Sequence, residues 1–182
     1  MTAACQRGQV KGQAADPIPQ DTLITLERWP DFFLVGPFYK VTISADGAVR
    51  FEPRAYNNKY REKVVGGNII TGRISQEQLQ QLIAEFERIN FYSLPDTSDD
   101  PRKNSKDDCP NYLYDSSATV LAITTKGKSK EVHHYLGCDG TKALSDLIGL
   151  EYKIDEAVNT KQFLDRDREN NNTNASKPPG SK

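Results

Sequence analysis

The two histidines of the chain, His133 and His134, are its clearest candidates for acid–base or metal chemistry. They are adjacent in residues 129–136, a segment whose pattern predicts a β-strand. Because neighbouring strand residues point to opposite faces of a sheet, the two rings cannot easily bind one metal ion. We therefore expect one imidazole packed against the sheet and one exposed, and no metal site. The alternative is a metal-assisted or hydrolase-like enzyme that uses His133 or His134.

Two of the three cysteines, Cys109 and Cys138, lie in the body of the chain. Cys109 sits in an acidic loop and Cys138 just past a predicted strand. Two such thiols are the right number for one disulfide if the protein is exported, whereas in a reducing cytosol both stay ordinary thiols. Neither belongs to a C-x-x-C motif, so their spacing does not support a zinc site.

The third cysteine, Cys5, follows the small residues Thr2, Ala3 and Ala4. This run resembles the tail of a bacterial lipoprotein signal, whose cysteine is lipidated, although Thr2 stands where such signals usually have leucine. The charged and apolar regions of a signal peptide do not precede it in the chain as given. The resemblance implies a lipid anchor at Cys5, and the alternative is an incidental cysteine in a disordered terminus.

The loop over residues 96–111 is rich in aspartate and could supply oxygen ligands to calcium. Its acidic residues are Asp96, Asp99, Asp100, Asp107 and Asp108. Their spacing does not match an EF-hand loop, and three nearby cations offset their charge. We expect a solvated loop. The chain also has no Walker A, G-x-G-x-x-G or G-x-S-x-G motif, so the sequence predicts no cofactor and favours a protein that is not an enzyme.

Two segments are candidates for binding a partner. The first interleaves cations with aromatic residues at Arg50, Arg54, Tyr56, Lys59, Tyr60, Arg61 and Lys63. It is either a solvated hairpin extension or a contact surface. The second is an apolar cluster formed by Trp29, Phe32, Phe33, Leu34, Val35 and Phe38. It either folds under the sheet as core or forms an exposed patch of the aromatic type that dominates binding energies.

The elements that must position these residues follow from periodicity. Alternating residues predict strands over 22–28, 38–44, 48–52, 117–124 and 129–136, with a further short strand over 68–73. Asp46-Gly47 predicts a tight hairpin turn. Apolar residues at helical spacing predict helices that begin after Ser75, with Gln78 completing a capping box, and over about 141–158. On the apolar face of the second helix, Glu151 is the one misfit. The fold class expected is α+β, a mostly antiparallel sheet of about five or six strands with two helices packed on one face.

The chain is long enough for one domain with tails. Its 182 residues include 24 basic and 25 acidic ones, for a net charge of −1. We expect a disordered linker over 1–20, a single domain over 21–164 and a disordered polar tail over 165–182. A net charge this small gives no reason to expect nucleic acid. No run is apolar enough to span a bilayer, so membrane contact is expected only through the possible N-terminal anchor.

From Leu26 to Phe51 the chain resembles an uncharacterised bacterial domain family found often in exported proteins. The family pattern is L-x-R, then C-x-G-x-C-P-x-Y-x-x-x-I, then D-G and an aromatic strand. The residues that fit are Leu26, Arg28, Pro37, Tyr39, Ile43, Asp46, Gly47, Val49 and Phe51. Looser matches extend the resemblance over about 22–160. The cysteine pair of the pattern is missing here, so no role of that pair carries over.

Together these observations predict a non-enzymatic binding or structural module of the bacterial cell envelope. If a signal lies upstream, the module is periplasmic or envelope-associated, and otherwise it is cytoplasmic. The expected partner is a protein or a small molecule. The residues we select for binding are Trp29, Phe32, Phe33, Tyr56, Tyr60 and Arg61.

Overall fold

The computed structural model describes residues 17–31, 33, 36–57 and 62–166. The strands are β1 (Leu23–Trp29), β2 (Tyr39–Ser44), β3 (Ala48–Asn57), β4 (Glu62–Val65), β5 (Ile70–Arg73), β6 (Asn111–Tyr112), β7 (Ala118–Thr125), β8 (Lys128–Tyr135) and β9 (Cys138–Asp139). The α-helices are α1 (Gln76–Arg88) and α2 (Lys142–Val158), and residues 160–166 are also helical. Two short 3₁₀ turns are η1 (Phe91–Ser93) and η2 (Pro101–Lys103).

The main sheet is antiparallel, with the strand order β4-β3-β2-β1-β7-β8, and β5 pairs with the first half of β3. The β2–β3 hairpin turns at Asp46-Gly47. Gly47 has a φ of +79°, and a Cβ there would lie 2.5 Å from the Ile74 carbonyl oxygen. Only glycine combines that backbone angle with such a close approach, so this residue sets the register of Val41 opposite Phe51.

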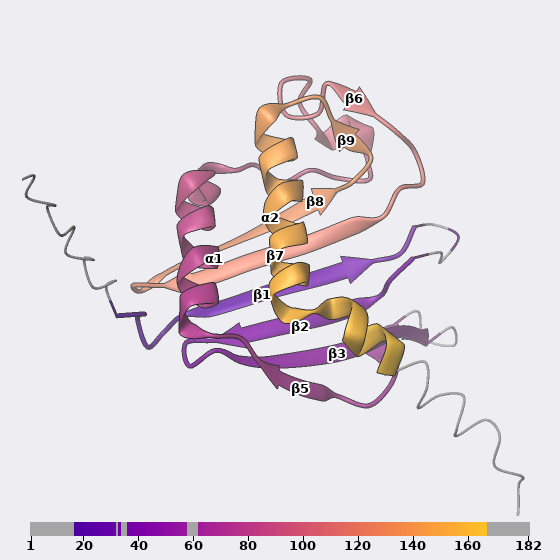
Figure 1. The fold of residues 1–182 in the computed structure, drawn as a ribbon. Coiled ribbons are helices and arrows are strands. Elements are labelled where there is room, and N and C mark those ends of the chain that lie inside the picture. The colour runs from indigo at the N-terminus through magenta and orange to yellow at the C-terminus, as the bar shows by residue number, and fades with distance from the viewer. Residues whose placement is uncertain (1–16, 32, 34–35, 58–61, 167–182) are drawn as a thin grey trace, which may run out of the picture.

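Both α-helices lie across the same face of the sheet (Figure 1). Ser75 caps α1 in a complete capping box with Gln78, and the Thr141 side chain accepts a hydrogen bond from the Leu144 backbone N–H at the start of α2. The core between the layers is apolar and fully buried. It includes Leu79 and Phe86 of α1, Leu147 and Ile154 of α2, and Leu26, Val41, Leu121 and Val132 of the sheet. The residues of this core alternate along each central strand, so the residues between them face away from the helices.

The predicted α+β class, with an antiparallel sheet and two helices on one face, is confirmed. Most of the differences lie in short elements without a periodic sequence. β3 continues to Asn57 and pairs with β4, and β6 and β9 form a separate two-stranded sheet. Alternation of apolar and polar side chains cannot predict a two-residue strand, because two residues are too few to show a repeating pattern. Within the described residues, no helix has the length and apolar character needed to cross a membrane.

Candidate functional site

A groove of about 980 Å³ lies on the sheet face that the helices leave uncovered. Its floor is the outward-facing residues of three neighbouring strands. The register sets Glu27 of β1 opposite Val120 of β7, and Val120 opposite His133 of β8. One step along, Ala122 lies opposite Glu131. Small apolar side chains in the middle and larger polar ones beside them make a shallow channel across the strands.

The first wall of the groove is the segment over residues 96–104, which is attached to the outer edge of β8. The Thr97 backbone N–H donates to the His133 carbonyl oxygen at 2.8 Å, and the Asp96 carboxylate accepts from the His133 N–H at 3.0 Å. The Thr97 hydroxyl accepts from the Tyr135 N–H at 2.8 Å. Farther out, the Asn104 side chain makes two hydrogen bonds of 2.7 Å to the backbone of Ser98. The wall is therefore held by specific polar contacts instead of a regular strand.

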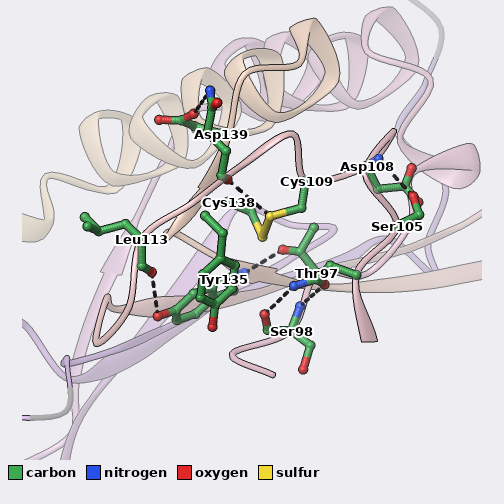
Figure 2. Close-up of a disulfide and its surroundings, with 12 residues drawn as sticks. Thr97, Ser98, Ser105, Asp108, Cys109, Leu113, Tyr135, Cys138 and Asp139 are labelled. Carbon is green, nitrogen blue, oxygen red and sulfur yellow. Dashed lines mark hydrogen bonds between the residues drawn. A yellow bond between two sulfur atoms is a disulfide. The ribbon is translucent and has the colours of Figure 1, made fainter. Parts of the chain in front are cut away.

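The second wall is the segment over residues 112–116, which the disulfide between Cys109 and Cys138 anchors to β9 (Figure 2). The two Cα atoms are 5.0 Å apart, and the bridge closes a sequence separation of 29 residues. The Tyr135 hydroxyl donates to the Leu113 carbonyl oxygen and accepts from the Ser116 N–H, both at 3.0 Å. These contacts fix the wall at both ends.

Gly137 allows this second wall to approach the sheet. A Cβ on Gly137 would lie 2.1 Å from the Leu113 carbonyl oxygen and 2.4 Å from the Tyr135 ring. The Leu113 N–H also donates to the Gly137 carbonyl oxygen at 2.7 Å. Any larger residue would push the tyrosine-bearing segment outward.

Tyr112 joins the two walls, because its hydroxyl donates to the Asp99 carbonyl oxygen. Its ring packs between those of Tyr114 and Tyr135, with centroids 5.0 and 5.3 Å away. Burial raises the pKa of Tyr112 above its usual range, and the neighbouring Tyr135 raises it further. The hydroxyl therefore stays protonated and keeps its donor role at physiological pH.

Acidic side chains dominate the lining of the groove. The carboxylates are Glu27, Asp31, Asp96, Asp99, Asp115 and Glu131, whereas Lys103 is the one lysine or arginine among the described residues that line it. His133 is half exposed on the floor, with its Nε2 3.1 Å from Glu131 Oε1. A concave surface lined by one sign of charge concentrates the electric field and attracts the opposite charge.

Aromatic side chains form part of the groove lining, and large apolar residues next to the lining segments in the chain are exposed. Trp29 lines it and packs against Phe38, with ring centroids 6.0 Å apart. Phe33 is 71% exposed, and Leu113 and Tyr114 are each 68% exposed. Large apolar groups that remain in water near a concavity are typical of interaction surfaces.

The opposite face of the same strands carries a buried ionic network under α2. His134 Nδ1 lies 2.8 Å from Glu151 Oε1, which also accepts a 2.5 Å hydrogen bond from the Thr119 hydroxyl. Arg28 Nη1 lies 3.3 Å from the other oxygen of Glu151. The side chains of His134 and Glu151 are 0% and 1% exposed. This network fills the position where Glu151 interrupts the apolar stripe of α2.

Arg28 extends the network to Asp155 and Tyr39. Its Nη2 lies 2.7 Å from Asp155 Oδ2, and the Tyr39 hydroxyl donates to Asp155 Oδ1 at 2.5 Å. Burial alone would lower the pKa of Arg28, but the Asp155 and Glu151 carboxylates raise it above its usual value. Burial also raises the pKa of Tyr39, and the charge of Asp155 adds to that rise. Both groups are therefore locked in their ordinary protonation states, which suits a structural role.

The histidines lie on opposite faces of β8. His133 is 58% exposed in its side chain and lines the groove, while His134 is enclosed beneath α2. The structure thus separates the two rings and gives each a different glutamate. Sequence reasoning selected both histidines but missed Glu151, Arg28 and Thr119 as partners of His134. The one available signal was Glu151 itself, the single charge on an apolar helical face.

The other selected residues are distributed unevenly. Trp29 lines the groove and Phe33 is exposed, whereas Cys5, Phe32, Tyr60 and Arg61 lie outside the described residues. The backbone of Tyr56 pairs with Lys63 between β3 and β4, away from the groove strands. Of the neighbouring cations, Arg50 and Arg54 both pair with Glu52.

The aspartates of the acidic loop mostly bind their own segment. The Asp100 carboxylate accepts from the Arg102 backbone and side chain, and Asp108 accepts from Ser105. Over the described part of the chain, no group of three or more His, Cys, Asp or Glu residues is arranged to hold a metal ion. Sequence reasoning also missed Tyr112 and Tyr114 as groove-lining residues. They belong to the irregular second wall, which has no repeating pattern in the sequence.

A family model described as a domain of unknown function (DUF6438) matches residues 35–157. This match covers more than half of the chain and contains all of β2 through β9, both walls of the groove and nearly all of α2. Leu26 and Arg28, the first residues of the resemblance seen in the sequence, precede it. No curated protein matches the chain.

Proposed function

The chain belongs to the DUF6438 family, whose description names no activity, and from the groove we propose that it is a non-enzymatic binding module of the bacterial cell envelope. The observation that carries this proposal is the uncovered sheet face, where a groove of about 980 Å³ is lined by Trp29 and by Tyr114, whose side chain is 68% exposed. The proposed role is to hold a partner against the strands β1, β7 and β8.

The construction of the groove supports a binding role. Ligand sites in proteins typically occupy about 300–1,000 Å³ and combine apolar walls with a few placed polar groups. Both walls are fixed before any ligand arrives, one by the hydrogen bonds of Asp96 and Thr97 and one by the disulfide. A pre-formed site loses less conformational entropy on binding than a flexible one.

Three observations support a location in the envelope. Cys109 and Cys138 form a disulfide, and such bonds persist in oxidising compartments such as the periplasm. The resemblance of residues 2–5 to a lipoprotein signal fits a domain tethered at Cys5. The family pattern seen in the sequence, common in exported proteins, points the same way even though its cysteine pair is missing here.

The alternative function is hydrolase-like chemistry at His133. Its imidazole lies 3.1 Å from Glu131, and a carboxylate can orient a catalytic imidazole. However, Cys109 and Cys138 are both held in the disulfide, so neither thiol is free to act as a nucleophile beside this imidazole. The pair of Glu131 and His133 is therefore assigned to ligand contact.

Site-specific photo-crosslinking tests the binding role. A photoreactive amino acid replaces Val120 on the groove floor, and in a matched variant it replaces Tyr152, which is 65% exposed on the helical side. In cells of the source bacterium, we expect a discrete crosslinked partner from position 120 and not from position 152. The purified partner should then bind the wild-type chain and lose affinity at least about tenfold for Trp29→Ala, since aromatic anchors dominate interface energies. Equal crosslinking from both positions, or none at 120, would contradict the proposal.

Thiol labelling tests the location. In intact cells lysed under denaturing conditions, Cys109 and Cys138 should react with a maleimide only after reduction. If both thiols label without reductant, the protein matures in a reducing compartment and the envelope assignment is wrong. Radiolabelled palmitate incorporation that is lost in Cys5→Ala is the corresponding test of the lipid anchor.

A further inference from the structure

We propose that the groove takes a cationic polypeptide, an extended segment rich in lysine or arginine. This inference rests on the proposed binding function and specifies its ligand. Three properties of the groove support it: the charge, the shape and the aromatic lining. Different residues determine each property.

The charge of the groove is locally strong although the whole chain is nearly neutral. Six carboxylates line it against Lys103, while the net charge of the 182 residues is −1. The ion pairs seen among the described residues do not join Asp96, Asp99 or Asp115 to any lysine or arginine. A cationic partner would therefore meet these three carboxylates without displacing a lysine or arginine of the described chain from them.

These carboxylates are spread along the channel instead of converging on one point. Glu131 stands on the floor, Asp96 and Asp99 belong to the first wall, and Asp115 belongs to the second. A compact metal ion needs several oxygens within about 2.6 Å, which this spread does not provide. A polypeptide with several cationic side chains along its length matches this distribution of carboxylates better. The negative charge of the groove would repel the phosphates of a nucleic acid, so nucleic acid does not fit this site.

The aromatic side chains favour lysine and arginine over a simple polyamine or inorganic cation. Trp29, Tyr112 and Tyr114 line the groove beside the carboxylates. Aromatic faces attract ammonium and guanidinium groups, by about 0.5–2 kcal/mol per contact, and also cover their aliphatic stems. The chain uses this contact on its other side, where the Arg28 guanidinium lies 5.5 Å from the centre of the Tyr152 ring.

The size of the groove supports a peptide as well. Its volume of about 980 Å³ is at the upper end of the range for small-molecule sites. The floor around Val120 leaves room for a backbone, and the walls stand on either side to receive side chains. An extended peptide presents its side chains alternately to two sides, as this arrangement requires.

Fluorescence anisotropy with labelled nona-lysine, nona-arginine and nona-glutamate tests the inference on the full chain. The groove variant combines Asp99→Asn, Asp115→Asn and Glu131→Gln, and asparagine tolerates the positive φ of residue 115. The control variant removes the same charge from exposed positions outside the groove, with Asp107→Asn, Glu77→Gln and Glu156→Gln. Denaturation midpoints confirm that both variants are folded.

At low salt, we expect nona-lysine and nona-arginine to bind the wild-type chain and nona-glutamate not to bind. The groove variant should lose affinity at least about tenfold, equivalent to about 1.4 kcal/mol. The control variant should lose less than about threefold, because exposed charges farther away are screened. Trp29→Ala should weaken nona-arginine binding while leaving the net charge unchanged.

Equal losses in the groove and control variants would overturn the inference, because they would show attraction to the whole surface. Binding of spermidine as tight as that of nona-lysine would also overturn it, since no polypeptide would be needed. In either case, a partner crosslinked through position 120 would still support the proposed binding function, and only the identity of the ligand would be wrong. Failure at position 120 together with absent peptide binding would remove both.

Discussion

The two faces of β1, β7 and β8 use the same strands for opposite purposes. On the helix-covered face, His134, Glu151 and Arg28 are enclosed, and Glu151 pairs with both of the others. On the uncovered face, His133 and Glu131 are each 58% exposed and stand in an acidic groove. Adjacent residues of one strand therefore belong to a structural network and to a candidate ligand site. Residue type alone does not separate these roles, because each face has an imidazole beside a glutamate.

The difference shows how solvent decides what a charged pair contributes. Under α2, the charges have lost their water, so each depends on its protein partner, and removing one leaves the others uncompensated. In the groove, water screens each charge, and the pair of His133 and Glu131 contributes little to folding. Groups that folding does not need remain available to bind a ligand. Substitutions at matching positions on the two faces test this difference.

The largest expected effect is from Glu151→Ala. It removes the acceptor of His134, Thr119 and Arg28 and should lower the free energy of unfolding by about 3–5 kcal/mol. The matched change on the uncovered face, Glu131→Ala, should alter it by less than about 0.5 kcal/mol. Urea denaturation followed by circular dichroism measures both. Similar losses for the two variants would mean that the network under α2 is not a stabilising unit.

Helix α2 shows how much of the helix-covered face could be predicted from the sequence. The apolar spacing of Leu147 and Ile154 predicted both the helix and its buried side, because local periodicity is visible in one segment. Glu151 was recognised as a misfit, but its partners Arg28 and His134 lie 123 and 17 residues away in the chain. Pairings over such separations depend on the strand order, which a single sequence does not specify.

The second prediction concerns the disulfide that anchors one wall of the groove. Cys109→Ser with Cys138→Ser should cost about 3–4 kcal/mol, the loop entropy expected for a closed segment of this length. The main sheet does not contain the bridge, so hydrogen exchange should rise mainly over residues 105–116 and much less over β1 and β2. Uniform acceleration across both regions would show that the wall and the sheet unfold as one unit. Reduction of the wild-type chain should reproduce the effect of the double variant.

The groove was less predictable than the helices because its walls have no repeating pattern. Residues 96–104 were expected to be a solvated loop, yet Asp96 and Thr97 bind the edge of β8. The apolar cluster after β1 left two readings open, core or contact patch. Phe33 is exposed, and Trp29 and Phe38 are half-buried against each other, so the described members of this cluster do not belong to the hydrophobic core. Short polar contacts of this kind have no sequence signature beyond residue type.

The third prediction compares the two histidines directly. His134→Ala removes a buried ring and its 2.8 Å contact with Glu151, and should cost about 1–3 kcal/mol. His133→Ala removes an exposed ring and should change stability by less than about 0.5 kcal/mol. The order reverses for binding of a labelled nona-lysine peptide, which should respond to His133→Ala more than to His134→Ala. A destabilising effect of His133→Ala would show that the groove floor serves the fold as well.

The smallest expected effect separates two neighbouring wall residues, Asp99 and Asp100. Hydrogen bonds from the Arg102 side chain and backbone lower the pKa of Asp100 to about 2. Because the pKa of this carboxyl is lower in the folded protein than in the unfolded chain, its small contribution is complete above about pH 4 and is lost as the pH falls through about 2. Arg102→Gln should return the pKa of Asp100 toward its usual value, observed by carbon NMR of the carboxyl. Arg73→Gln, at a distant exposed pair, should leave it unchanged. A wild-type midpoint near 4 would mean that Arg102 does not hold the Asp100 carboxylate in the folded protein.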